Sequence, residues 1–200
     1  MSEAAARKPR PRNAAATKAL LLKAATDEFA EYGLAGARID RIAERAGANK
    51  RLLYVYFGDK NQLFDAVVQE QTEAVLESAP MDDGDLCAFA TARFDYVLAN
   101  PEARRIAAWR SFEQTEPSES ERRAFKTRIE AVEKAQRAGR LRTDIPAADL
   151  FAFVLRMTES WLSAPVALQA AAGEEALTPD RLEQHRAALQ TAVRSLVEPA

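Results

Sequence analysis

The side chains best suited to binding chemistry lie in a short segment, residues 50–57. A helix over this segment places two cations, a phenol and a small apolar group on one face, namely Lys50, Arg51, Tyr54 and Val55. Lysine and arginine donate to guanine O6 and N7, and a small apolar group contacts the thymine methyl. This face therefore suits contact with base edges in the major groove of DNA.

Further donors close to this face suit contact with the DNA backbone. The hydroxyl groups of Tyr54 and Tyr56 can donate to phosphate, and Lys60 lies where the next helix is expected to begin, beside free backbone N–H groups. Phosphate contacts set the position of a protein on the duplex without distinguishing sequence. The alternative is an ordinary structural helix pair in which both tyrosines belong to the core.

Catalytic and metal-binding chemistry has little support. The chain has one histidine, His185, and one cysteine, Cys87, which exclude a disulfide within the chain and a site with several histidines. No GxGxxG or P-loop motif is present, and His185 lies in a stretch typical of an amphipathic helix. We expect a protein that is not an enzyme and that has no cofactor and no metal.

The elements that position the basic face follow a helix-turn-helix pattern. Apolar residues recur at three- and four-residue steps from Thr17 to Tyr32, and Gly33 is expected to end that helix. A short second helix is stopped by Gly47, and the three residues Gly47–Asn49 separate it from the helix that begins at Lys50. Two short helices joined by such a glycine-containing turn are typical of this motif.

The rest of the 200 residues also follows the helical period, and no segment alternates as a strand does. We therefore expect an all-α fold of about nine helices. Later helices are expected to begin near Lys60, Leu86, Pro101, Ser118, Pro146 and Thr178. No stretch is long and apolar enough to span a membrane and no secretory signal is apparent, which favours a cytoplasmic protein without a membrane partner.

Charge is unevenly distributed along the chain. Residues 1–60 carry 12 Lys and Arg against seven Asp and Glu, a formal charge of +5, whereas residues 61–200 carry 16 against 23, a formal charge of −7. A basic N-terminal part on an acidic remainder indicates an anionic partner for the first part only. The alternative is an asymmetry that serves solubility alone.

Three segments closely resemble the N-terminal domain of TetR-family transcriptional regulators. They are Phe29–Gly33, Ile39–Gly47 and Leu53–Leu63, within a match that runs without a gap from about residue 17 to residue 68. The resemblance implies a helix-turn-helix DNA-binding domain, which we place at residues 17–62. Residues 1–16 are expected to form a disordered basic arm that either enters the minor groove or stays solvated.

The roles of family residues are transferred by position. Asn49 and Lys50 match the start of the recognition helix, Tyr54 and Tyr56 match positions that contact phosphates and bases, and Lys60 matches the phosphate-binding lysine. The resemblance thus implies double-stranded DNA as a partner.

Two positions depart from the family pattern. Ala37 stands where the family usually has a threonine or serine that caps the second helix, and Leu52 stands where threonine is common. Both changes remove a hydroxyl group that could donate to a phosphate, so we expect Arg38 and Arg51 to compensate. Arg38→Ala should then weaken DNA binding in a fluorescence titration, and an unchanged affinity would contradict this hypothesis.

The resemblance also implies that residues 63–200 bind a small-molecule effector and form a homodimer. Candidate pocket residues are Phe89, Arg93, Tyr96, Trp109, Arg110, Glu113, Phe125 and Met157. Core packing is the alternative for each aromatic residue, and the charge of the effector stays open. Candidate residues of a four-helix dimer interface are Phe153, Met157, Trp161, His185, Leu189 and Val193.

Together these expectations describe a homodimeric repressor that an effector releases from a palindromic operator. One alternative is a TetR-like architectural protein that binds many DNA sites and has no effector. Another is an enzyme or carrier built on the helical body, which the single histidine and the single cysteine do not favour.

Overall fold

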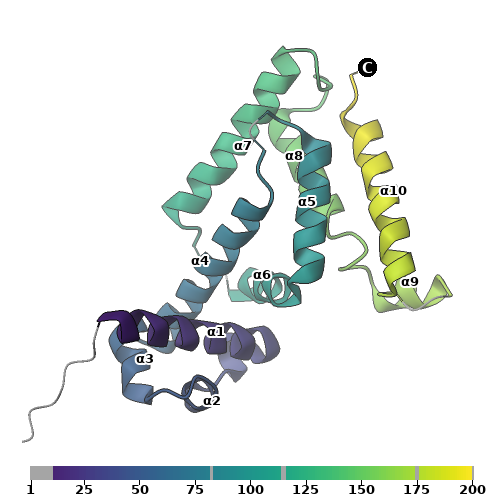
Figure 1. The fold of residues 1–200 in the computed structure, drawn as a ribbon. Coiled ribbons are helices and arrows are strands. Elements are labelled where there is room, and N and C mark those ends of the chain that lie inside the picture. The colour runs from purple at the N-terminus through teal and green to yellow at the C-terminus, as the bar shows by residue number, and fades with distance from the viewer. Residues whose placement is uncertain (1–10, 82, 114–115, 174–175, 200) are drawn as a thin grey trace, which may run out of the picture. The chain divides into compact units, whose positions relative to one another are not determined.

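The computed structural model describes residues 11–81, 83–113, 116–173 and 176–199, and within these ranges every regular element is an α-helix (Figure 1). The helices are α1 (Pro11–Gly36), α2 (Ile39–Arg45), α3 (Lys50–Phe57), α4 (Lys60–Ser78), α5 (Leu86–Ala99), α6 (Pro101–Glu113), α7 (Glu119–Arg137), α8 (Ala147–Met157), α9 (Val166–Ala171) and α10 (Pro179–Val197). The predicted all-α fold is confirmed.

The helices form two compact units. The first unit comprises residues 1–71 and 102–116, and so holds α1, α2, α3, the first part of α4, and α6. The second unit comprises residues 72–101 and 117–200, and so holds the end of α4, α5, and α7 to α10. The sequence-based division assigned every residue after 62 to the second domain, whereas α6 groups with the N-terminal helices.

Several boundaries differ from the expected ones. Helix α1 begins at Pro11, so residues 11–16 are helical, while residues 1–10 of the expected arm lie outside the described residues. Helix α9 was not expected, because its six residues are too few to establish a period. The helix expected to begin near Pro146 is α8, which ends at Met157, so Trp161 lies in the turns that follow it.

The first unit is built around one apolar core. Phe29 and Phe64 meet edge to face with ring centroids 5.1 Å apart, and Leu53 of α3 is fully buried beside them. Leu53 therefore fixes which side of α3 faces inward. Its burial turns the opposite side of α3 toward solvent.

Helix α6 is held against α1 by Trp109. The indole Nε1 of Trp109 donates to the carbonyl oxygen of Ala30 at 3.3 Å. Gly33 has φ +65°, and a Cβ at this position would lie 2.8 Å from the Trp109 ring. The predicted helix stop at Gly33 is thus a true break inside α1, and only glycine fits both the backbone angle and the space.

The second unit has a separate core. Phe151 of α8 lies between Phe89 of α5 and Phe125 of α7, with ring centroids 5.3 and 6.2 Å away. Leu189 and Val193 of α10 are buried in the same cluster. In the part of the chain that the structure describes, no helix is both long and apolar enough to cross a membrane.

Candidate nucleic-acid interface

The turn between α2 and α3 is fixed by local contacts. Gly47 takes φ +60°, which reverses the chain after α2. The side chain of Asn49 then accepts a hydrogen bond from the backbone N–H of Arg51 at 2.8 Å and caps α3. Helix α3 begins at Lys50, as predicted, because both of its start signals are local.

The outer face of α3 carries the four side chains expected to contact base edges. Lys50 and Arg51 are exposed, as are Tyr54 and Val55, whose exposed fractions are 48% and 66%. Tyr56 does not share this face. It is half-buried, packs on the core of the first unit and meets the Phe57 ring edge to face at 6.4 Å.

An ion pair links the candidate face to α2. The Nζ of Lys50 lies 2.8 Å from Oδ1 of Asp40. This hydrogen bond and the opposite charge raise the pKa of Lys50 and lower the pKa of Asp40, so both groups are charged at neutral pH. Sequence analysis did not identify Asp40 as a site residue, although it follows Ile39 in the expected second helix.

Neutralising Asp40 is expected to strengthen DNA binding. Asp40→Asn removes an anion from the edge of the basic face and frees Lys50 for a phosphate or a base, so affinity should rise by about threefold at low salt. Fluorescence anisotropy on a labelled duplex measures the change. Glu44→Gln, on the same helix, is the control, because Glu44 forms no ion pair with a cation of α3 among the described residues. Weaker binding by Asp40→Asn would mean that the ion pair helps to hold α3 in place.

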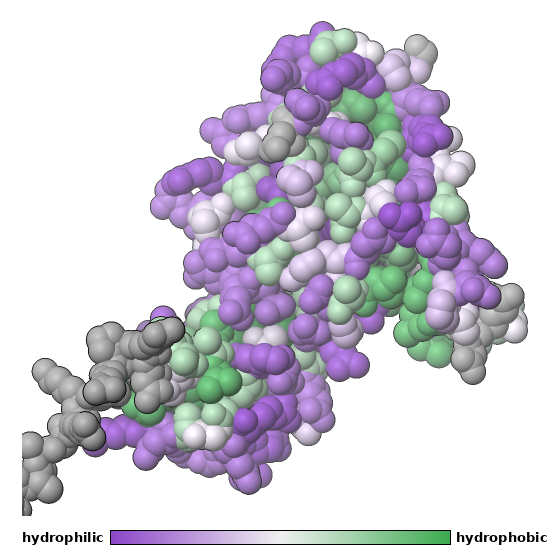
Figure 2. All heavy atoms as spheres, viewed as in Figure 1, coloured by the Kyte–Doolittle hydropathy of each residue, from purple (hydrophilic) through white to green (hydrophobic). Residues whose placement is uncertain are grey.

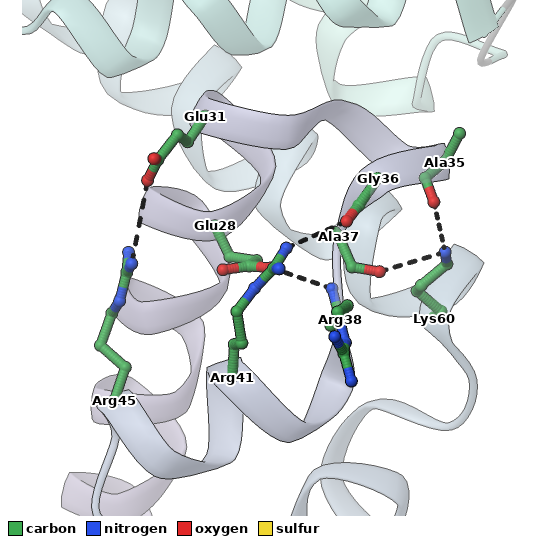
Figure 3. Close-up of polar contacts among 9 residues, drawn as sticks. All are labelled: Glu28, Glu31, Ala35, Gly36, Ala37, Arg38, Arg41, Arg45 and Lys60. Carbon is green, nitrogen blue, oxygen red and sulfur yellow. Dashed lines mark hydrogen bonds and ion pairs between the residues drawn. The ribbon is translucent and has the colours of Figure 1, made fainter.

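Lys60 begins α4 but contacts the protein backbone. Its Nζ lies 3.4 Å from the carbonyl oxygens of Ala35, in the last turn of α1, and Ala37, which follows α1 (Figure 3). The start of α4 is fixed by a reciprocal capping box, in which Asp59 accepts from the Gln62 N–H at 2.9 Å and Gln62 accepts from the Asp59 N–H at 3.0 Å. Lys60 therefore stabilises the connection between α1 and α2 in the absence of DNA.

A further cation lies near the end of α3. The Nζ of Lys18, on α1, is 5.5 Å from the centroid of the Phe57 ring. Sequence reasoning missed this residue because the contact joins positions 39 residues apart and no local pattern marks it. Arg38, in contrast, has an exposed side chain as expected for a DNA contact.

The structure divides the candidate effector residues between the two units. Trp109, Arg110 and Glu113 lie on α6 in the first unit, where Trp109 packs on the core. The other five lie in the second unit, and two of them, Phe89 and Phe125, meet Phe151 in its core.

Arg93 is the most deeply placed polar candidate. Its guanidinium forms an ion pair with Glu159 and donates to Oγ1 of Thr158 at 3.1 Å. Burial lowers the pKa of Arg93, although Glu159 counteracts this effect. Half-buried Tyr96 lies on the same helix, and half-buried Met157 borders the core. These candidates therefore supply apolar side chains and a largely buried charge pair.

A groove of about 470 Å³ runs along the surface of α7 in the second unit. Its lining mixes apolar and charged side chains: Pro117, Glu121, Arg122, Phe125, Lys126, Ile129, Glu130 and Glu133. Phe125 is the one candidate effector residue in this lining.

The candidate dimer residues also separate into two sets. Leu189 and Val193 are buried in the core of their own unit, so they face away from any partner chain. Phe153 of α8 is exposed over 52% of its surface. Sequence periodicity could not make this distinction, because α8 and α10 carry apolar residues on more than one side.

Trp161 and His185 form an aromatic cluster near the start of α10. The His185 ring lies 5.5 Å from Phe94 and 6.0 Å from Trp161, and the Arg181 guanidinium lies 3.8 Å over the Trp161 ring. The indole Nε1 of Trp161 donates to the carbonyl oxygen of Ala176 at 2.7 Å, which anchors the connection between α9 and α10.

The stability of the second unit is expected to fall on acidification through His185. Burial and the charge of Arg181 lower the pKa of His185 below its ordinary value of about 6.5. The unfolded chain therefore binds the proton more readily, so this stabilisation is present above pH 6.5 and is lost as pH falls through the lower folded value. The melting temperature, compared between pH 8 and pH 5, should fall further for the natural chain than for His185→Phe. Equal losses would exclude this role.

Similarity to known proteins agrees with this geometry. Residues 21–67 match the model of bacterial regulatory proteins of the tetR family, and residues 85–195 match a tetracyclin repressor-like C-terminal domain. The chain is 39% identical over 154 residues to the HTH-type transcriptional repressor SCO4008 of Streptomyces coelicolor, an alignment that covers 75% of this chain and 80% of that protein. It is 31% identical over 186 residues to the HTH-type transcriptional regulator Mb3439c of Mycobacterium bovis, covering 90% and 89% of the two chains.

A solved structure is similar along nearly the whole chain. The crystal structure of a transcriptional regulator from Streptomyces coelicolor, SCO4942, matches with a TM-score of 0.81 and 32% identity, and it covers 90% of this chain and 98% of its own. The helix-turn-helix geometry, the two matched domains and these relatives lead to one conclusion. The chain belongs to the TetR family of bacterial transcriptional regulators.

Proposed function

We propose that the protein is a homodimeric repressor that binds a palindromic operator through α3 and leaves it when a small molecule binds the second unit. The observation that carries the proposal is the exposed face of α3, where Lys50, Arg51, Tyr54 and Val55 stand on a capped helix. The similarity to SCO4008, a transcriptional repressor, supports the direction of regulation.

The exposed sides of α8 and α10 are suited to pairing with a second copy. On α10 the exposed residues include a run of small side chains, Ala187, Ala188, Thr191, Ala192 and Ser195. Small residues allow two helices to approach closely, and Phe153 of α8 adds a large exposed apolar group. A C2 dimer built on these faces presents two copies of α3, so its operator has two-fold symmetry.

The segment between α8 and α10 exposes further apolar side chains. Val166 and Leu168 of α9 and Leu177 beyond it are all exposed, and Figure 2 shows hydrophobic atoms gathered over this part of the second unit. Exposed apolar groups that gather in one place favour an interface with another chain. They support a dimer that uses the C-terminal helices.

Helix α4 can couple the effector to the operator. Residues 60–71 of this single helix belong to the first unit and residues 72–78 belong to the second. In one conformation the spacing of the two α3 helices does not fit the operator. An effector that binds this conformation more tightly lowers the operator affinity, and the decrease is limited by the difference between its affinities for the two conformations. In the second unit, Phe89, Phe125 and Met157 supply apolar contacts, and the Arg93–Glu159 pair supplies charge.

Selection of duplexes from a random DNA pool by the purified full chain tests the proposal. Fluorescence anisotropy of the selected duplex should give nanomolar, salt-sensitive affinity, with weak binding to a scrambled duplex. A palindromic consensus supports the dimeric repressor, and release by a small molecule in the same assay identifies the effector. Equal, weak binding to both duplexes favours the architectural alternative.

A further inference from the structure

Helix α2 lacks the usual cap at its N-terminus. Its N-cap residue, Arg38, has extended backbone angles, and its side chain makes no capping hydrogen bond. The preceding residue, Ala37, has no hydroxyl group to offer. A helix of seven residues depends strongly on such contacts, because its first backbone N–H groups have no partner within the helix.

A buried carboxylate from α1 contacts this helix end. The side chain of Glu28 is 0% exposed, and its Oε1 accepts from the backbone N–H of Arg38 at 2.9 Å and from Nε of Arg41 at 2.7 Å (Figure 3). The other oxygen, Oε2, is buried and has no hydrogen-bond partner among the described residues. Full burial of a carboxylate is unfavourable unless hydrogen bonds and an opposite charge compensate for the lost hydration.

The arrangement supplies, from another helix, one of the two hydrogen bonds of a capping box. In the ordinary box, a Glu or Gln at the third helical position reaches back to the N–H of the N-cap residue. In α2 that third position is Arg41, which cannot accept a hydrogen bond. Glu28 accepts from the N-cap N–H in its place, and Arg41 holds Glu28 there.

Further contacts join the end of α1 to the start of α2. A terminal guanidinium nitrogen of Arg41 donates to the carbonyl oxygen of Gly36 at 3.0 Å, and its guanidinium lies 4.2 Å from the centroid of the Tyr32 ring. Lys60 contacts the carbonyl oxygens of Ala35 and Ala37, as Figure 3 shows. The direction in which α2 leaves α1 is therefore set by side chains of α1, α2 and α4.

We infer that Glu28 is a positioning residue for DNA binding: it caps α2 from α1 and thereby sets the orientation of α3 relative to the α1 cation Lys18. The inference rests on the proposed function, because it concerns the same DNA-binding surface. Helix α3 follows α2 after a short turn and packs through Leu53, so an error at the start of α2 passes to the basic face. A face that is ordered only on binding lowers the observed affinity.

Two variants and a control test the cap. Glu28→Leu removes it, whereas Glu28→Leu combined with Arg41→Gln supplies an acceptor at the third position of α2 and keeps the net charge of the natural pair. Glu31→Leu is the control, since Glu31 is an exposed glutamate on α1 whose ion pair with Arg45 is long, at 3.9 Å. All measurements are made at a temperature at which circular dichroism shows each variant to be folded.

Two readouts are combined. Amide hydrogen exchange of the free protein reports the Arg38 N–H directly, and anisotropy on the selected duplex reports affinity and its salt dependence. For Glu28→Leu, we expect at least tenfold faster Arg38 exchange and about tenfold weaker binding, with an unchanged salt slope because the phosphate contacts stay the same. The double variant should recover both values to within about threefold, and Glu31→Leu should change neither.

Each result decides the inference. Unchanged Arg38 exchange in Glu28→Leu overturns the cap, and weaker binding that the double variant fails to restore assigns Glu28 to general stability instead. If the natural chain binds no selected duplex, the proposed function fails, yet Arg38 exchange still tests the cap.

Should Glu28→Leu not fold, Glu28→Gln replaces it. Its amide oxygen keeps the Arg38 bond but loses the charge that holds Arg41, so intermediate exchange supports the cap and natural exchange contradicts it.

Discussion

Replacing Lys50 and Arg51 together with alanine is expected to weaken operator binding by at least about a thousandfold. Each residue offers a charged donor to a base edge or a phosphate, and each such contact changes affinity by about tenfold or more. The proposed dimer would use both residues twice, so four contacts would be lost in one variant. Anisotropy on the selected duplex measures the loss, and the salt slope should fall as well.

The matched control for this prediction is Arg123→Ala/Lys126→Ala. These two residues lie on α7, are also exposed, and form ion pairs with glutamates of their own helix. The control removes the same two charges from the chain without touching α3. A comparable loss of affinity in both double variants would mean that net charge, and not the face of α3, governs binding.

Breaking the C-terminal helix pairing is expected to weaken operator binding by about a hundredfold or more. Phe153→Glu combined with Ala188→Glu places two buried, unpaired charges in the proposed interface, which prevents association. A monomer has one α3, and it loses the gain that comes from linking two binding sites, which is typically 10²- to 10⁴-fold. Sedimentation velocity measures the change from dimer to monomer, and anisotropy measures the affinity.

Thr127→Glu, at an exposed position of α7, is the control because it adds a charge to the second unit on a helix outside the proposed interface. It should leave both mass and affinity unchanged. A double variant that stays dimeric would place the interface on another face of the second unit. A variant that becomes monomeric yet binds the operator with unchanged affinity would show that binding does not require two copies of α3.

The helix-turn-helix could be predicted closely because its signals are local. Gly47 and Asn49 each act within a few residues, so they fix the end of α2 and the start of α3 without help from distant parts of the chain. The Asp59–Gln62 capping box acts in the same way at the start of α4. In each case, one short stretch contains both the signal and the structure that it determines.

Contacts between distant residues could not be predicted in this way. Trp109 was expected in an effector pocket, but it donates to Ala30 on α1, 79 positions earlier. Glu28 follows no helical stripe that marks it, and its partner Arg41 lies on another helix. Leu189 and Val193 were expected at a dimer interface from the family resemblance, but both side chains pack into the core of their own unit.

The docking of Trp109 beside Gly33 limits how regulators of this kind can be recombined. A chimaera that joins residues 1–71 to a foreign effector domain would lose α6, and with it the ring that covers Ala30 and Gly33. The portable DNA-binding module is therefore discontinuous in the gene. A functional hybrid must transplant residues 102–113 together with the N-terminal segment, or redesign the surface that Trp109 covers.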